Sequence, residues 1–335
     1  MAAGAERASG APRRRTFVRL GGRILTVIGV AIFVSAATFF LLRLARDPVD
    51  VVGAARGADI SDPAARSALE AELGTDRPLV VQYLHWLGNA AQGDLGTSYL
   101  RPDQEVRDTI GRALPVNLEL VLVSQLIALL IGIPMGLAAG ARAGARLDRL
   151  LSGAAAAFVS TPGFVVALGL ITVFAVQLPW FPVTASGYVG FFEDPWTNLQ
   201  QIALPSLSLA VPMIGVYARV LRSDVSVTLQ EDFILMARSK GVPTRRVLFR
   251  HAFRPSSLSL IPLVALQCGA LLGGSILVEQ LFAFPVGLGS SLVTAAIAAD
   301  IPVLLGVSTT IAVLFAVVTL VADAVARFAD PRIDG

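Results

Sequence analysis

Reactive and ionisable side chains are scarce in this chain, and each shortage excludes a class of function. The single cysteine, Cys268, has no partner for a disulfide or for a thiolate metal cluster. The two histidines, His85 and His251, form no His-Glu-x-x-His pattern, and neither lies in an apolar run where it could activate a serine. We therefore expect no catalytic residue, no metal site and no cofactor on this chain.

Lysine is almost absent as well, since only one of the 27 Lys and Arg residues, Lys240, is a lysine. A phosphate-binding P-loop needs a lysine followed by serine or threonine, whereas Lys240 precedes Gly241. We therefore expect any ATP that drives this chain to be bound by another subunit. The excess of arginine suggests GC-rich coding and hence a bacterial source.

Charge is sparse too: 15% of the residues are Asp, Glu, Lys or Arg, against about 25% in soluble domains, while 55% are hydrophobic. A helix that spans a bilayer needs about 20 apolar residues. Uncharged runs of suitable length occur at Ile24–Leu42, Leu120–Ala141, Leu150–Gln177, Pro195–Ala218, Pro255–Val278 and Ile301–Ala322. The sequence predicts an all-α polytopic membrane protein with six transmembrane helices.

One further uncharged run, Gln280–Ala299, is interrupted by Pro285-Val286-Gly287-Leu288-Gly289. Proline and glycine in the middle of a run break a helix, and neither half is then long enough to span. We expect a re-entrant or surface loop here, and the sequence leaves open whether it dips into the membrane.

The arginines predict the orientation. They precede the first run and follow the second, fourth and sixth, at Arg7, Arg13, Arg14, Arg15, Arg19, Arg23, Arg142, Arg146, Arg149, Arg219, Arg222, Arg327 and Arg332. The loops 178–199 and 279–300 contain no Lys or Arg. The positive-inside rule then places both termini in the cytoplasm, and the eight arginines of Arg43–Arg112 lie in a long segment of the kind that escapes the rule.

The predicted divisions are a basic cytoplasmic tail (1–23), a first helix (24–44), an extracytoplasmic helical segment (45–114), a five-helix core (115–328) and a cytoplasmic tail (329–335).

Arg14-Arg15 before an apolar run also resembles a twin-arginine export signal. The run is longer than the usual 7–15 residues of a signal peptide, and five more spans follow. We therefore expect no cleavage and treat residues 1–15 as a disordered tail.

Two helices are predicted in the extracytoplasmic segment. Asp62-Pro63 is a typical helix start, and Gly74 is a typical end. A second helix is expected from Pro78 to about Ala91, with an apolar face formed by Leu79, Tyr83, Trp86, Leu87 and Ala90. This face either packs on the membrane domain, which we favour, or contacts an external partner.

Carboxylates within the spans would indicate ion coupling, because a charge at the bilayer centre is costly and is usually retained for function. Glu119, Asp224, Glu279 and Asp323 are all expected at helix ends within reach of water. This disfavours ion-coupled transport without excluding it, since broken helices also bind Na⁺. Possible break points are Pro134, Pro162, Pro205, Pro212 and Pro262.

A basic, amphipathic segment at 229–254 separates two apolar runs. Leu229, Phe233, Met236 and Ala237 recur at helical spacing and predict an apolar stripe on a short helix. Gly241 suits a helix C-terminus and Pro243 the start of the next helix. Arg246, Arg250 and Arg254 then repeat every four residues as one basic face. Such a helical hairpin fits either a groove on a soluble protein or the surface of an anionic membrane.

The segment resembles the EAA loop of ABC importer permeases, in the form found in the dipeptide/oligopeptide/nickel family. The matching residues are Asp232, Ala237, Arg238, Lys240, Gly241, Arg245, Arg246, Val247, Leu248, Arg250, His251, Ala252 and Arg254. The likeness extends over nearly the whole chain, through 41–44, 72–79, 82–84, 93–99, 114–120 and 330–333, and is closest to the B-type permease subunit.

Four departures from the family pattern stand out. Leu235 and Met236 occupy the places of the glutamate and first alanine of the broader EAA pattern. Pro255 replaces a frequent asparagine, which is expected to shorten the second coupling helix. Val286 is an extra residue in the Pro-Gly-Leu-Gly turn, and Asp47-Pro48 lacks the usual preceding Pro-Gly.

The resemblance implies a type I ABC importer permease fold and a non-catalytic subunit of the bacterial inner membrane. Two homologous permeases would form the pathway, two cytosolic P-loop ATPases would dock on the loop at 224–255, and an extracytoplasmic binding protein would deliver the solute. Membrane lipid is the other expected partner, and nucleic acid is not. The residues implied in coupling are Asp232, Phe233, Ala237, Arg238, Lys240, Gly241, Arg245, Arg246, Arg250 and His251.

Family frequency favours di- or oligopeptides as the substrate, but the sequence identifies no substrate-binding residue. An ion-coupled secondary transporter remains the alternative, and it requires an essential membrane carboxylate. A membrane-anchored scaffold without transport activity is a third reading.

Overall fold

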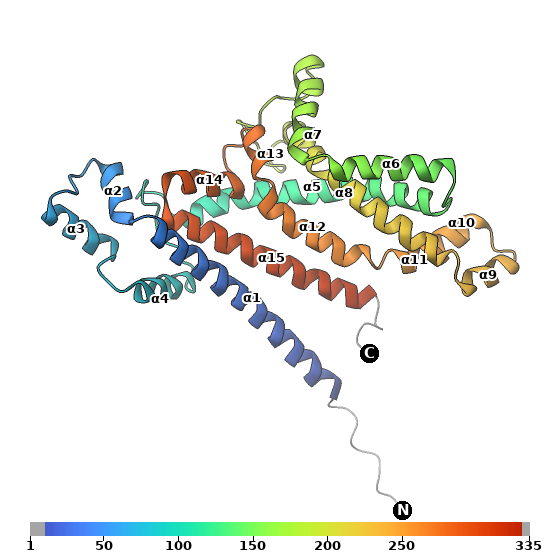
Figure 1. Cartoon of the computed structure of the whole chain (residues 1–335), viewed down its shortest axis with the longest axis horizontal. Helices are drawn as coiled ribbons and strands as arrows, with labels where there is room; N and C mark the ends of the chain where they lie inside the picture. Colours follow the sequence, from blue (N-terminus) through green and yellow to red (C-terminus); the bar gives the residue numbers. More distant parts are fainter. Residues whose placement is uncertain (1–10, 330–335) are drawn as a thin grey trace, which may run out of the picture.

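The computed structural model describes residues 11–329 as a helical molecule, with one isolated β-bridge in that range between Thr97 and Glu105. Most helices run side by side in an elongated bundle (Figure 1). In chain order they are α1 (Ala11–Ala45), α2 (Pro48–Arg56), α3 (Pro63–Leu73), α4 (Leu79–Ala90), α5 (Val106–Gly140), α6 (Arg146–Ser160), α7 (Gly163–Leu170), the π-helix η1 (Ile171–Gln177), α8 (Pro195–Thr228), α9 (Asp232–Ser239), α10 (Thr244–Arg246), the π-helix η2 (Val247–Ala252), α11 (Phe253–Ser256), α12 (Leu260–Gly274), α13 (Ile276–Leu281), α14 (Leu288–Ala298) and α15 (Ile301–Ala329).

Within residues 11–329, four helices are long and apolar enough to cross a bilayer: Leu25–Ala45 within α1, all of α5, all of α8, and Ile301–Ala326 within α15. Two further pairs are bent at a short break, α6 with α7 and η1 by 98°, and Thr244–Ser256 with α12 by 57°. Counting each bent pair as one span gives six, the number that the sequence predicts. The all-α membrane fold is therefore confirmed.

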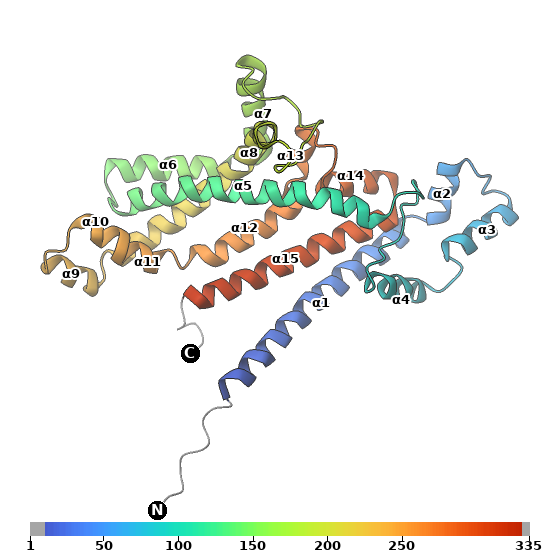
Figure 2. The same ribbon diagram turned by 180° about the vertical axis from the view of Figure 1, so that it is seen from behind.

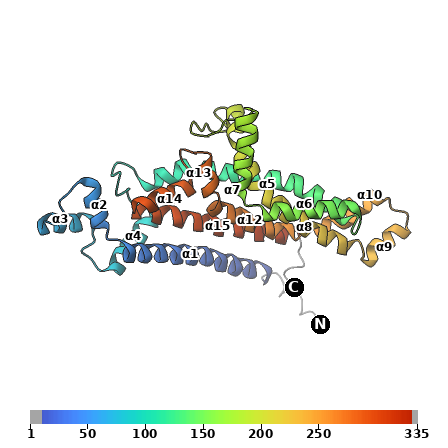
Figure 3. The ribbon, with the colours of Figure 1, turned by 45° about the horizontal axis from the view of Figure 1, so that its top comes forward.

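The third predicted span, Leu150–Gln177, is bent rather than straight, and the bend falls at Pro162, one of the break points that the sequence suggests. α6 ends at Ser160, Thr161 has extended backbone (φ −93°, ψ 117°), and α7 begins after Pro162. Proline disfavours helical backbone at the preceding residue and lacks the N–H that would continue the hydrogen-bond ladder. α7 and η1 consequently turn away from the direction of α6 and project to one side of the bundle, while α7 still packs against α8 and α13 (Figures 1 and 3).

The centre of the bundle is the contact between α5 and α8. Leu120 of α5 and Tyr217 and Leu221 of α8 are fully buried there. Gly136 permits the close approach, because a Cβ atom at this position would lie only 2.8 Å from the carbonyl oxygen of Ala218. Small residues have this role at helix contacts in membranes. α1 lies along α15, as the view from behind shows (Figure 2).

Two helices begin earlier than predicted. α5 starts at Val106 rather than near residue 115, because Val106, Ile110 and Ala113 are buried against α14 and α15. Burial in the bundle thus extends the helix beyond its uncharged run. α1 starts at Ala11, so residues 11–23 of the predicted tail are helical. The remainder of that tail and residues 330–335 of the C-terminal tail lie outside the described residues.

The two helices predicted in the extracytoplasmic segment are confirmed as α3 and α4, with caps at Asp62, Gly74 and Pro78. The segment packs on the bundle. The Tyr83 hydroxyl donates a hydrogen bond to the Ile32 carbonyl (3.1 Å), and it also pairs with the Ser35 hydroxyl at 2.9 Å. Leu79, which was predicted to share this face, is 41% exposed because it lies in the first turn, away from α1. α2 was not predicted.

The run at 280–299 begins in the last two residues of α13, passes through the Phe282–Gly287 turn and then forms one short helix, α14. α14 is apolar but too short to span. Leu288 and Ala295 of α14 are buried with the first turns of α5 and with α15. The prediction that this run is not a seventh span is therefore confirmed, and the run forms a packed lid over one end of the bundle.

Candidate coupling segment and outer polar network

Residues 224–255, called the coupling segment below, occupy the end of the bundle opposite α2, α3 and α4 (Figure 1). The segment consists of the last turn of α8 followed by α9, α10, η2 and most of α11. The start of α1 and the end of α15 lie toward the same end of the molecule (Figures 1 and 2). The segment is thus displayed on one end of a helical bundle.

A glycine turn fixes the shape of the coupling segment. Gly241 has φ +74°, and its N–H donates to the carbonyl of Arg238 at 2.9 Å. The N–H of Val242 donates to the carbonyl of Ala237 at 3.2 Å, which completes a Schellman motif. The left-handed glycine predicted here is confirmed, and Pro243 caps the start of α10 as expected. The chain therefore reverses direction without an irregular loop.

A small apolar core holds the two arms of the segment together. Ile234 of α9 is fully buried with Val247 and Ala252 of η2, and Leu229 and Val242 pack against them. Leu229 was predicted to share an apolar stripe with Phe233 and Met236, but it packs against this core because it ends α8 and is not part of α9. Sequence reasoning missed Ile234, although apolar residues on both sides of a Gly-Val-Pro turn are a signal of such a core.

Most of the residues predicted to couple lie on the outer surface of this segment. Phe233 and Met236 are 48% and 58% exposed, although both are large and apolar. Ala237 and His251 are half-buried. The charged members are all exposed, at Asp232, Arg238, Lys240, Arg245, Arg246 and Arg250. The surface thus combines exposed apolar groups with a surplus of cations, which is a suitable composition for docking on a partner.

The second arm is less regular than its arginine spacing predicts. Arg246, Arg250 and Arg254 are exposed, but the turn between them is the π-helix η2. Pro255 gives a physical reason, because it has no N–H for the carbonyl of His251 and its ring crowds that carbonyl. A wider turn directly before the proline relieves both problems. The three arginines therefore do not form the regular α-helical face that was predicted.

An ion pair ties this end of the bundle together. The Asp148 carboxylate at the start of α6 accepts two hydrogen bonds from Arg222 of α8, at 2.9 and 2.7 Å. It also accepts the Gly144 N–H at 2.8 Å and the Ser152 hydroxyl at 3.0 Å. Bidentate, charge-assisted pairs such as Asp148 with Arg222 are the stronger ones in proteins. A second polar contact near this end joins α8 to α11, where the hydroxyls of Thr228 and Ser256 are 3.0 Å apart.

We expect Asp148→Asn to lower the melting temperature of the purified protein by about 5 °C, because it weakens four hydrogen bonds, two of them to a charged group. Asp108→Asn is the matched control, since Asp108 is exposed and its nearest cation lies 3.8 Å away. Thermal unfolding followed by tryptophan fluorescence measures both variants. Equal melting temperatures would contradict a structural role for this pair.

A buried polar network lies at the other end of the bundle. The Glu279 carboxylate, fully buried, accepts hydrogen bonds from Asn117 Nδ2 (2.7 Å), the Ser275 hydroxyl (2.6 Å) and the Ser290 N–H (2.8 Å). Asn117 Oδ1 in turn accepts the Leu288 N–H at 2.7 Å. Glu279 and Asn117 thus satisfy two of the free N–H groups in the first turn of α14. We call these residues the α14 clamp.

The prediction that the span carboxylates all lie at helix ends within reach of water was therefore wrong for the burial of Glu279, and for Glu119 it was wrong about the place in the helix. Glu279 is buried because α14 folds over it. Glu119 lies well inside α5, since that helix begins at Val106, and it accepts hydrogen bonds from the Tyr188 hydroxyl and from Asn198. Asp224 is near the end of α8, as predicted, and bonds the Ser259 hydroxyl. The side chain of Asp323 is outside the described part of the structure.

Comparison with known proteins identifies the family. Residues 132–335 match the model of the binding-protein-dependent transport system inner membrane component. The chain belongs to this family of permeases. It is accordingly a multi-pass inner-membrane component of a binding-protein-dependent transport system, and the resemblance noted in the sequence is confirmed.

Relatives align along almost the whole permease. The oligopeptide transport system permease protein AppB of Bacillus subtilis is 34% identical over 93% of this chain and 98% of its own length. The dipeptide transport system permease protein DppB of Lactococcus lactis is 28% identical over 78% of this chain and 82% of its own length. The inward-facing MetNI methionine ABC transporter has a similar fold, with a TM-score of 0.54 and 19% identity over 66% of this chain and 96% of the matched one.

Proposed function

We propose that this permease is one half of the translocation pathway of an ATP-driven importer of di- or oligopeptides. A homologous second permease supplies the other half, and an extracytoplasmic binding protein delivers the peptide. Two cytosolic P-loop ATPases dock on the coupling segment, so ATP hydrolysis takes place on subunits other than this one. Both termini and the coupling segment lie on the cytoplasmic side. The relatives named as peptide permeases support the substrate class.

The observation that carries the proposal is that the coupling segment has a fixed shape and exposes its α9 surface at one end of the bundle. Its shape is set by the Gly241 turn and the Ile234 core, while Phe233 and Met236 remain exposed. An apolar helix face flanked by cations suits a groove on a soluble partner. Because α8 leads into the segment and α12 leads out of it, a displacement of α9 moves two spans at once.

One observation in the structure favours the alternative function, an ion-coupled secondary transporter. This observation is the buried carboxylate of Glu279. Ion-coupled transporters use carboxylates within the membrane. However, Glu279 has no exposed surface and already accepts three hydrogen bonds from groups of the protein. We therefore assign Glu279 to the α14 clamp rather than to an ion pathway.

Uptake of a labelled dipeptide by proteoliposomes separates the two mechanisms. The permease is reconstituted with the proteins encoded beside its gene, and ATP is trapped inside the vesicles. We expect uptake that requires both ATP and the binding protein and that persists when ionophores dissipate proton and sodium gradients. Uptake that continues without ATP and stops with ionophores would show an ion-coupled transporter instead.

A further inference from the structure

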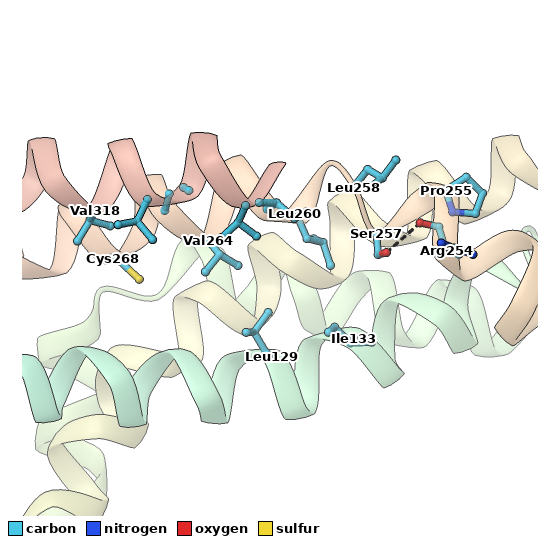
Figure 4. A pocket seen from close by; sticks show the side chains of 15 residues that line it. Leu129, Ile133, Arg254, Pro255, Ser257, Leu258, Leu260, Val264, Cys268 and Val318 are labelled. Atoms are coloured by element: carbon cyan, nitrogen blue, oxygen red, sulfur yellow. Dashed lines mark hydrogen bonds between the residues drawn. The ribbon is translucent and has the colours of Figure 1, made fainter. Parts of the chain in front are cut away.

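A long apolar groove runs between α5, α12 and α15 and ends beside the coupling segment. Its volume is about 1100 Å³. Leu129 and Ile133 form its α5 wall, and residues of α12 and α15 form the other walls. Figure 4 shows these side chains in a row along the helices, with Cys268 and Val318 at one end and Arg254 and Pro255 at the other. The groove thus has an apolar body and one basic end.

The groove is as deep as one leaflet of a bilayer. From Leu260 to Cys268 an α-helix rises about 12 Å, at roughly 1.5 Å per residue. Half the hydrocarbon core of a bilayer is about 15 Å thick. A transmembrane helix from a partner would cross both halves, whereas an acyl chain occupies only one. The depth therefore matches a lipid chain.

The lining excludes a peptide. Apart from Arg254, the polar side chains are Ser257 and Cys268, and the Ser257 hydroxyl already donates to the Arg254 carbonyl at 3.0 Å (Figure 4). A peptide carries an N–H and a C=O at nearly every residue, and each would be buried here without a partner. An alkyl chain has no such groups. The groove is therefore not the substrate pathway.

The basic end selects the head group. Arg254 is exposed and follows η2, so its guanidinium lies where the apolar lining stops. Basic residues at this depth of a membrane protein extend to the interface and attract anionic lipids. We propose that the groove is a binding site for an anionic phospholipid, with one acyl chain between α5, α12 and α15 and the phosphate at Arg254.

The site adjoins a hinge. The groove includes Ser257 and Leu258, which lie in the break where the helices turn by 57° between Ser256 and Leu260. The acyl chain of a bound lipid packs against both sides of this break. The lipid thereby restricts bending between the coupling segment and α12. This proposal does not depend on the identity of the transported solute.

Photolabelling tests the site. The full chain, co-expressed with the proteins encoded beside its gene, is placed in bilayers that contain phosphatidylglycerol or phosphatidylcholine with a diazirine on the acyl chain, and the labelled residues are located by mass spectrometry. We expect labelling of α12 and α15 around the groove. The phosphatidylglycerol probe should label about fivefold more than the phosphatidylcholine probe, the preference expected from one arginine near the surface.

Two pairs of variants test the binding of the acyl chain and the binding of the head group separately. Val321 is 55% exposed and lines the groove, so Val321→Trp fills it and should reduce labelling by both probes at least tenfold. Val317→Trp, on the same helix but outside the groove, should leave labelling unchanged. Arg254→Gln should abolish the preference for phosphatidylglycerol but keep labelling by phosphatidylcholine. Arg250→Gln, an equal loss of charge outside the groove, should preserve the preference.

Three results would overturn the proposal. Labelling that survives Val321→Trp would show that the acyl chain of the lipid lies outside the groove. A preference for phosphatidylglycerol that is absent, or is lost equally in Arg250→Gln, would show that Arg254 holds no phosphate. A groove that is unlabelled in the assembled complex would show that a partner subunit fills it. Val325→Trp, at another exposed lining position, repeats the filling test if Val321→Trp is not recovered folded.

Discussion

Glu279→Ala is expected to lower the free energy of unfolding by at least about 3 kcal/mol, because a buried donor left without an acceptor costs roughly 1–3 kcal/mol. The substitution removes the acceptor for Asn117 Nδ2, the Ser275 hydroxyl and the Ser290 N–H at once. The first turn of α14 then loses one of its caps. Thermal or denaturant unfolding in detergent, with hydrogen exchange over residues 282–298, measures both effects.

Two companion variants separate the causes. Glu279→Gln keeps the shape but places an NH₂ group against donors, so we expect a loss smaller than that of alanine but still measurable. Glu193→Ala removes an exposed carboxylate from the outer loop and should leave stability unchanged. If Glu279→Ala unfolds like Glu193→Ala, the α14 clamp carries no stability and its assignment is wrong.

A steric variant tests the clamp from the other side. A Cβ atom at Gly287 would lie 2.1 Å from Glu279 Oε2, whereas one at Gly190 would lie 3.9 Å from its nearest neighbour. Because Gly287 has extended backbone (φ −164°), alanine there is not strained by its own conformation. Gly287→Ala should therefore destabilise the protein solely by displacing the carboxylate, and Gly190→Ala should not.

Gly241→Asp is expected to reduce ATP-driven uptake at least tenfold while the chain stays folded. Space is not limiting, since no atom lies within 4 Å of a Cβ built at this position. The change adds a carboxylate to the turn of a surface that has a surplus of cations, and it strains a backbone at φ +74° that L-residues rarely adopt. Uptake and co-purification of the ATPase are the two readouts.

The chain offers a matched control for this substitution. Gly74 ends α3 with φ +64° and the same two hydrogen bonds, Gly74 N–H to Ala71 and Thr75 N–H to Glu70, and it too has open space around it. Gly74→Asp carries equal strain at the opposite end of the molecule and should preserve uptake. Gly241→Asn separates strain from charge. Similar losses in Gly74→Asp and Gly241→Asp would place the defect in folding rather than in coupling.

The fold was largely predictable because membrane spans and caps have local causes. Uncharged runs located the spans, and Asp62-Pro63 with Gly74 located α3 from residues within one helix. The same signal, Asp47-Pro48 followed by Gly57, marks α2 and was overlooked as a departure from the family pattern. The break before α7 falls at Pro162, one of the break points that the prolines suggested. The early start of α5 was not predictable from hydrophobicity, because it depends on packing against α14 and α15.

The two candidate sites also differ in whether their causes are local in the sequence. The Gly241 turn is local and was predicted, whereas the α14 clamp joins Asn117 to Glu279 and Leu288, residues far apart in the sequence. No periodicity brings them together; only the fold of α13 and α14 over α5 does. A glutamate between two uncharged runs, shortly before a turn that contains proline and glycine, was the one available signal. It was interpreted as an exposed helix end because the burial by α14 could not be seen.

The proposed docking of α9 on a P-loop ATPase can be tested with a cross-link from a single cysteine. In a Cys268→Ala background, which removes the only native cysteine, Ala237→Cys places a thiol on the half-buried face of α9 and Ser186→Cys places one on the exposed outer loop. With a short bifunctional reagent, we expect residue 237 to cross-link to the ATPase and residue 186 not to. The contrary result, no ATPase adduct at residue 237 in an assembled and active complex, would contradict the claim.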